Sequence, residues 1–75
     1  MKELLAKLRQ QMLADSTKTY HDCTWRLFGV IEVLVDDVPH VCAQLLASYL
    51  EVLSEDATHD REIVNEVLPI IPEIT

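Results

Sequence analysis

The segment from Val38 to Leu53 has the most regular pattern in the chain and constrains the fold most strongly. Its apolar side chains recur at intervals of three and four residues, at positions 38, 41, 42, 45, 46, 49, 50 and 53. This spacing places them on one face of an α-helix. Asp36 or Asp37 is expected to cap the helix, and Pro39 suits its first turn, where the missing N–H costs nothing. The pattern predicts a helix whose apolar face packs in a core.

Three further helices are predicted from the same period. The first covers residues 2–14, with leucines and Met12 on one side and Arg9 among the polar residues on the other. The second covers residues 18–35 and is apolar on nearly every side, so that several neighbours must cover it. The fourth begins near Thr58 and ends at residue 68, because the following proline disfavours helix there. Residues 69–75 are expected to form an extended apolar tail.

Few residues of the chain suit the tight turns of a β-protein. Gly29 and Asn65 are its single glycine and single asparagine, whereas β-hairpins use both residue types repeatedly. Residues 30–35 are rich in β-branched side chains and could form a strand, but a lone strand has nothing to pair with here. We therefore predict an all-α fold, a small four-helix bundle of two helical hairpins, in which residues 1–75 form one domain.

The second and third predicted helices resemble each other at an offset of nineteen residues. The segment from His21 to Asp37 aligns with the segment from His40 to Asp56, and both contain Glu-Val-Leu at corresponding positions. Amphipathic helices of equal length also resemble one another without a common origin. An internal helix duplication is therefore a hypothesis that the sequence raises without deciding.

The aligned segments each contain a His-x-Cys unit, and the four residues are the weak metal-site candidates His21, Cys23, His40 and Cys42. Two histidines and two cysteines suit tetrahedral zinc. However, residues two apart on a helix point in nearly opposite directions, and the usual zinc-ligand spacings are absent. We expect no metal, no cofactor and no thiol enzyme, because a catalytic cysteine and histidine must converge in space.

The net charge of −7 is distributed unevenly along the chain. Residues 1–18 carry four basic against two acidic side chains, whereas residues 19–75 carry eleven acidic against two basic ones. Such an acidic surface repels phosphate, so direct nucleic-acid binding is not expected. No apolar stretch reaches the roughly 18 residues of a membrane span, and no signal-peptide core begins the chain, so a cytoplasmic protein without membrane contact is expected.

The apolar residues divide into an expected core and an expected interface. The core is expected to comprise Leu8, Leu27, Ile31, Leu34, Cys42, Leu45, Leu46, Tyr49, Leu50, Leu53, Val64 and Val67. The second helix and the tail offer more apolar surface than three helices of this size cover, and exposed apolar patches mark interaction sites. The expected interface residues are Trp25, Phe28, Ile70, Ile71 and Ile74.

These features predict a small acidic protein–protein interaction module or regulator that acts by helix packing, as a homodimer or on another protein. The alternative is an acidic inhibitor, of the kind made by phages and mobile elements, that occupies the basic nucleic-acid groove of an enzyme. The alternative requires a stripe of acids at near-phosphate spacing. The acidic pairs at residues 36–37 and 55–56 suit helix capping equally well.

Overall fold

The computed structural model describes residues 1–71, which form four α-helices and a short 3₁₀ turn. The elements are α1 (Lys2–Ala14), α2 (Asp22–Leu34), α3 (Pro39–Val52), α4 (Thr58–Val67) and the 3₁₀ turn η1 (Leu68–Ile70). The described residues contain no strand, so the predicted all-α fold is confirmed. Residues 30–34 are helical, as the last turns of α2. None of the helices within residues 1–71 is long and apolar enough to cross a membrane.

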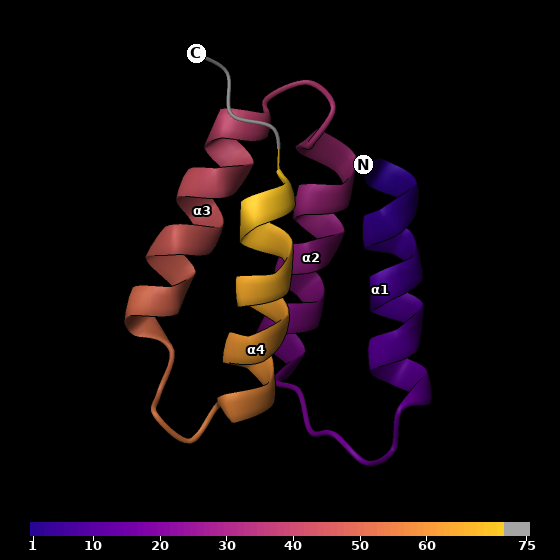
Figure 1. Ribbon diagram of the computed structural model, residues 1–75, viewed down its shortest axis with the longest axis vertical. Coiled ribbons are helices and arrows are strands. Elements are labelled where there is room, and N and C mark those ends of the chain that lie inside the picture. Colours follow the sequence, from indigo (N-terminus) through magenta and orange to yellow (C-terminus); the bar gives the residue numbers. More distant parts are fainter. Residues whose placement is uncertain (72–75) are drawn as a thin grey trace.

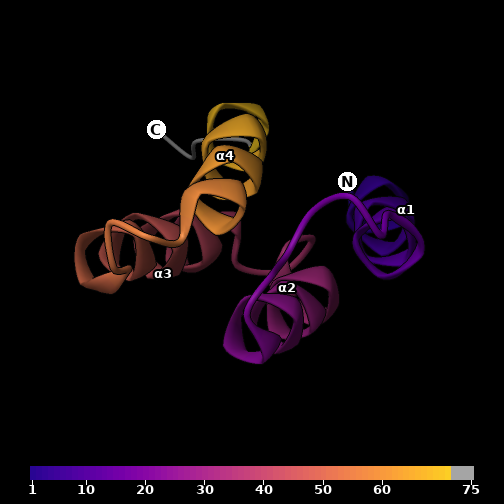
Figure 2. The ribbon, with the colours of Figure 1, turned by 90° about the horizontal axis from the view of Figure 1, so that it is seen from below.

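The four helices alternate in direction, so each runs antiparallel to the next (Figure 1). Viewed from one end, α1 and α3 lie on either side of α2, and α4 lies beside α3 (Figure 2). The pairing of α1 with α2 is the most extensive helix–helix packing, whereas α4 packs on α3 and on the turn that follows it. This arrangement is consistent with a four-helix bundle made from two hairpins.

The core receives side chains from every helix. Its buried apolar residues are Leu5, Met12, Phe28, Ile31, Val35, Cys42, Leu46, Ile63, Val64, Val67 and Ile71. Of the residues expected there from the sequence, Ile31, Cys42, Leu46, Val64 and Val67 are buried, and Leu8, Leu27, Leu34, Tyr49, Leu50 and Leu53 are partly buried. Leu45 differs from expectation, because its side chain is 39% exposed. The apolar stripe of α3 is wider than the surface that its neighbours cover.

The ends of α2 and α3 differ from prediction for local reasons. Helix α2 begins at Asp22 rather than near residue 18, because His21 has extended backbone angles and acts as its N-cap. The N-cap of α3 is Val38, with no side-chain cap, and both Asp36 and Asp37 are exposed in the preceding turn. The predicted aspartate cap was therefore wrong. Since the residue before a proline avoids helical angles, the N-cap position falls next to the proline.

The segment after α4 also departs from the extended tail that was predicted. The helix ends at Val67, and η1 then turns the chain so that Ile71 returns to the core, whereas Ile70 stays 46% exposed. Pro69 is compatible with a 3₁₀ turn because it lies in the first turn, where the proline nitrogen needs no acceptor. Ile74 and the other residues of 72–75 lie outside the described part of the chain.

Leu46 and Leu45 provide a test of this packing at neighbouring positions. Replacing the fully buried Leu46 by alanine should lower the free energy of unfolding by about 2–5 kcal/mol, because a cavity replaces buried methyl groups. Leu45→Ala should lower it by less than about 1 kcal/mol. Urea unfolding followed by far-UV circular dichroism measures both. Similar losses at the two positions would contradict the orientation of α3.

Candidate functional site

A buried carboxylate, Asp60, is the centre of a polar cluster where α2 begins. Asp60 lies in the first turn of α4, and its side chain is only 1% exposed. One carboxylate oxygen accepts a hydrogen bond from the backbone N–H of His21 at 2.9 Å and another from the hydroxyl of Thr24. The other oxygen accepts from His21 Nδ1 at 3.1 Å. Every donor belongs to the start of α2, so Asp60 joins two segments that are far apart in sequence.

Asp60 takes the place of a local N-terminal cap for α2. The N-cap residue, His21, makes no side-chain hydrogen bond to its own helix. The carboxylate from α4 instead binds the N-cap N–H and places negative charge at the positive end of the α2 dipole. It also lies in the first turn of its own helix, where the same charge is favourable. One side chain therefore stabilises two helix N-termini.

The polar cluster extends from Asp60 to α3. Thr24 donates its hydroxyl proton to Asp60, so the hydroxyl of Tyr49 must donate to Thr24 Oγ1. The Tyr49 oxygen also lies 3.8 Å from Cys23 Sγ. Because Tyr49 belongs to α3, the polar cluster links α2, α3 and α4 at one end of the bundle.

The cluster has opposing effects on the pKa of Asp60. Burial raises the pKa, but hydrogen bonds from Thr24 and from the backbone and ring of His21 lower it more, and the net result is a pKa below the usual aspartate value. Asp60 is therefore a carboxylate at neutral pH. The pKa of the Tyr49 hydroxyl is raised, mainly because burial disfavours its charged form, so this group remains a proton donor.

The hydrogen bonds of the polar cluster run between helices. His21 forms an aspartate–histidine pair, but within residues 1–71 no hydroxyl or thiol is hydrogen-bonded to its ring. The hydroxyl of Thr24 is directed to Asp60, and the Cys23 thiol lies 3.8 Å from the hydroxyl of Tyr49. The hydroxyl of Thr24 thus contacts α4, and the thiol of Cys23 contacts α3. Asp60 and Thr24 were not singled out from the sequence, because neither position differs locally from an ordinary helix N-terminus.

The two His-x-Cys units do not meet. Helices α2 and α3 are antiparallel and begin at opposite ends of the bundle (Figure 1). Cys23 is exposed, whereas Cys42 is buried with its Sγ 4.0 Å from the carbonyl oxygen of Ile31, and both are free thiols. Among the described residues, no group of three or more His, Cys, Asp or Glu side chains is placed to hold a metal ion. His40 is exposed near the start of α3.

Arg9 was expected on the polar face of α1 but lies partly buried against α2. Its Nη1 donates to Glu32 Oε2 at 2.7 Å, and its guanidinium carbon lies 4.2 Å from the centre of the Trp25 ring. Such stacking of a cation on an aromatic face is favourable. A methyl group on Gly29 would stand 3.0 Å from Arg9 Nη2, so the missing side chain at this position leaves room for the guanidinium.

The solvent-facing side of the α1–α2 pair, which we call the outer face, is largely apolar around Arg9. An open groove of about 440 Å³ is lined there by Trp25, Gly29, Val30, Val33 and Leu34 together with the two arginines at positions 9 and 26. Val33 is 66% exposed, and Val30 and Leu13 are also exposed.

The residues that were expected at an interface differ in their exposure. Trp25 lines the groove of the outer face and is partly buried. Phe28 and Ile71 are buried, which corrects their assignment, because both point into the core rather than away from it. Ile70 is exposed next to α4, and Ile74 lies outside the described residues. Sequence periodicity did not separate Phe28 from the outer face, since α2 is apolar on nearly every side.

Comparison of the chain with protein-family models, curated proteins and solved structures found no match.

Asp60→Asn tests the role of the buried carboxylate. The amide keeps the shape but loses the charge that the donors of His21 and Thr24 require, and a hydrogen bond to a charged group contributes about 1.5–3 kcal/mol. We expect the free energy of unfolding at pH 7 to fall by at least about 2 kcal/mol. Asp22→Asn, which removes an exposed carboxylate paired with Arg26, should cost less than about 1 kcal/mol.

The effect of Asp60 should also depend on pH in a defined direction. Its pKa in the folded protein is below the unfolded value of 3.8, so its stabilisation is present above pH 3.8 and is lost as the pH falls through the folded pKa. The difference in unfolding free energy between the wild type and Asp60→Asn should therefore shrink towards acidic pH. Urea titrations between neutral and acidic pH measure this difference. A difference that grows on acidification would contradict the hydrogen-bonded carboxylate.

The cysteines should differ in their reaction with a thiol reagent such as dithionitrobenzoate. Cys23 is exposed and should react within the mixing time or shortly after. Cys42 is buried, and burial raises the pKa of its thiol, so it should react only as fast as the protein opens. The absorbance of the released thiolate should give one fast thiol in the native protein and two in denaturant. Loss of the fast phase in Cys23→Ser identifies it, and equal rates would contradict the burial of Cys42.

Proposed function

We propose that this chain is a small protein–protein interaction module that acts by helix packing and associates as a homodimer through the outer face of α1 and α2. The observation that carries the proposal is the exposure of Leu13, Val30 and Val33 around the groove beside Trp25. Apolar patches of this kind on a small protein mark surfaces that a partner covers. In a homodimer with two-fold symmetry, the same face of both copies is buried at once.

The charges of the outer face favour a second copy as the partner. A chain with a net charge of −7 repels itself unless the surfaces that meet are nearly neutral. On this face Glu32 is paired with Arg9, and Asp22 is paired with Arg26 at 2.7 Å. Each of these two acids is therefore balanced by an arginine. The outer faces of two copies can approach each other without repulsion between like charges.

The required area indicates how much of the face must be covered. A stable interface commonly buries about 800 Å² on each partner. That is about a sixth of the 4969 Å² of accessible surface on this chain. A single valine cannot supply such an area. The dimer should therefore cover the groove up to Val33 on α2 and also the adjoining hollow beside Arg9 and Trp25, which Leu13 of α1 lines.

The alternative of an acidic inhibitor that occupies a nucleic-acid groove has less support. The pair at residues 36–37 lies in the connection between α2 and α3, whereas the pair at residues 55–56 lies in the connection between α3 and α4. These connections are at opposite ends of the bundle (Figure 1). The two acidic pairs thus do not form one stripe, which a phosphate mimic would need.

Two valine-to-glutamate variants test the proposed dimer. Val33→Glu places a charge in the outer face and should convert the dimer to a monomer, because an unpaired charge would be buried at the interface. Val52→Glu is the matched control, since Val52 is 76% exposed on α3, away from the outer face, and should leave the dimer intact. Sedimentation equilibrium at tens of micromolar protein gives the mass of each.

Salt separates apolar from electrostatic association. The wild-type mass should be the same in about 0.1 M and about 0.5 M salt, because screening weakens interactions between charges and leaves apolar burial in place. A wild-type monomer at these concentrations, or a dimer that survives Val33→Glu and dissociates with Val52→Glu, would overturn the proposal.

A further inference from the structure

A second groove lies between α1 and α4, on a different side of α1 from the outer face. Its volume is about 370 Å³, and it is open to solvent along one side. The apolar side chains that line it are Leu8, Met12 and Ala14 from α1, Tyr20 from the following connection, and Ile63 from α4. Met12 and Ile63 are nearly buried and belong to the core, so the groove reaches down to the centre of the bundle.

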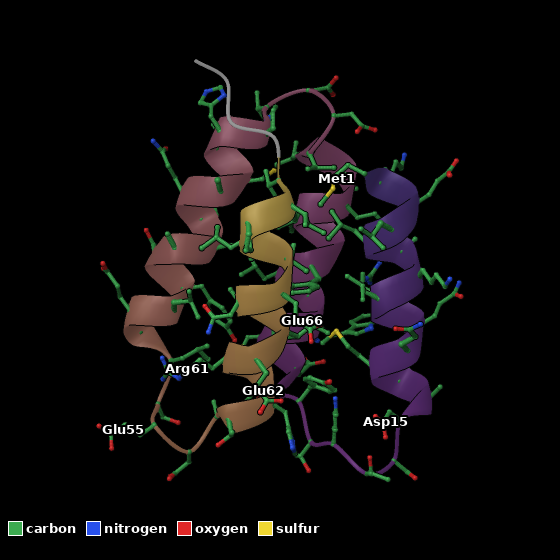
Figure 3. The ribbon with its side chains drawn as sticks, in the orientation of Figure 1. Met1, Asp15, Glu55, Arg61, Glu62 and Glu66 are labelled. Carbon is green, nitrogen blue, oxygen red and sulfur yellow. The ribbon has the colours of Figure 1, made fainter. Side chains whose placement is uncertain are left out.

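The edges of this groove are acidic. Asp15, Glu62 and Glu66 line it against a single basic side chain, Lys18. Figure 3 shows Glu62 and Glu66 projecting from α4 and Asp15 at the end of α1. Within residues 1–71, none of these three carboxylates forms an ion pair. Hydrogen bonds from the side chain and backbone of Thr17 lower the pKa of Asp15, which keeps it charged at neutral pH.

The glutamates of α4 are placed at some cost to the helix. Glu62 and Glu66 are four residues apart, so their like charges lie next to each other on the helix surface. This spacing destabilises an isolated helix, whereas a lysine at either position would have stabilised it. Cations from another molecule would relieve the repulsion. The α1–α4 groove therefore combines an apolar floor with an unbalanced negative edge.

We propose that the α1–α4 groove binds an amphipathic basic helix from a partner protein. Apolar side chains of one face of that helix would contact Leu8, Met12 and Ile63, and flanking lysines or arginines would pair with Glu62 and Glu66. Binding of a helix in an apolar groove is a common mode of peptide recognition. This groove is a different surface from the one proposed for the homodimer, and binding of a helix here does not depend on dimer formation.

The geometry favours a helix over an extended peptide. An extended segment satisfies its backbone N–H and C=O groups by joining the edge of a sheet, and residues 1–71 contain no strand. A helix satisfies its own backbone groups and can lie along α1 and α4.

The basic N-terminal segment of a second copy of the chain is not a suitable ligand for this groove. The most basic segment of the chain is residues 1–18, but its apolar side chains Leu5 and Met12 are already buried in its own core. It would have to leave α2, against which it packs most extensively. Phosphate-bearing partners are repelled by the three carboxylates. The charge of the groove and the folded state of α1 thus point to a basic helix supplied by a different protein.

The test uses a designed peptide of about 15 residues, or four helical turns, with leucines along one face and lysines beside them. A matched peptide carries glutamate at each lysine position. We expect the lysine peptide to bind the full chain at least about tenfold more tightly than the glutamate peptide, and to weaken between about 0.1 M and about 0.5 M salt. Amide chemical shifts of the labelled protein should change at Leu8, Met12 and Ile63.

Charge reversal in the protein identifies the site. The double variant Glu62→Lys with Glu66→Lys should weaken binding of the lysine peptide by at least about tenfold. The control double variant Glu51→Lys with Glu55→Lys makes the same change in net charge at exposed positions of α3 and the α3–α4 connection, away from the groove (Figure 3 labels Glu55). It should retain the affinity within about threefold. Far-UV circular dichroism verifies that both variants remain folded.

Each remaining outcome has a defined meaning. Absence of binding at about 1 mM peptide, equal loss in both double variants, or shift changes confined to the outer face would overturn the proposal. Preferential binding of the glutamate peptide would overturn it as well. Shift changes at Leu8, Met12 and Ile63 that appear without peptide as the protein concentration rises would assign the groove to self-association instead. The variant Val33→Glu should still bind the lysine peptide, so failure of the homodimer and failure of this proposal are distinguishable.

Discussion

The carboxylate of Asp60 is the interaction on which the arrangement of the bundle depends. A charged group that is 1% exposed is tolerated only when hydrogen bonds replace the water it has lost, and here the donors come from His21 and Thr24. This requirement fixes the start of α2 against the start of α4. The connection from α1 is held nearby as well, since the backbone N–H of Thr19 donates to Nδ1 of His59 at 3.1 Å. These bonds hold the α1–α2 connection beside the start of α4, and Lys18 and Tyr20 of this connection line one part of the α1–α4 groove.

Each of the three arginines forms an ion pair or hydrogen bonds within the protein, and their positions decide which surface stays negatively charged. Arg9 and Arg26 balance acids on the outer face, whereas Arg61 donates to the carbonyl oxygens of Leu53 and Ser54 at the end of α3. The last contact is favourable because helix C-termini attract positive charge. Little basic charge is left for α4, and the α1–α4 groove stays acidic. One face is thus apolar and neutral and the other apolar and negative, which is why the two proposed partners differ.

The position of Gly29 relates helix propensity to packing. A glycine inside a helix costs about 1 kcal/mol relative to alanine. Here the space that it leaves is occupied by the guanidinium of Arg9, which also contacts Trp25 and Glu32. These contacts contribute to the α1–α2 packing and leave Val30 and Val33 on the solvent side of α2. Gly29 thus weakens α2 locally but makes room for a contact that stabilises the α1–α2 hairpin.

The sequence by itself determined the local structure. The bounds of α1 agree with the predicted residues 2–14, and the start of α4 at Thr58 was predicted, because helical period and end signals depend on residues within a few positions of each other. Only the tertiary structure decided which side of α2 is covered, that Asp60 is buried, and that Arg9 lies on Trp25. These contacts join residues 16 to 39 positions apart, and no local pattern distinguishes such a partner from a solvent-exposed neighbour of the same type. The surfaces proposed for binding arise from these long-range contacts, since each is what remains exposed after the helices have packed.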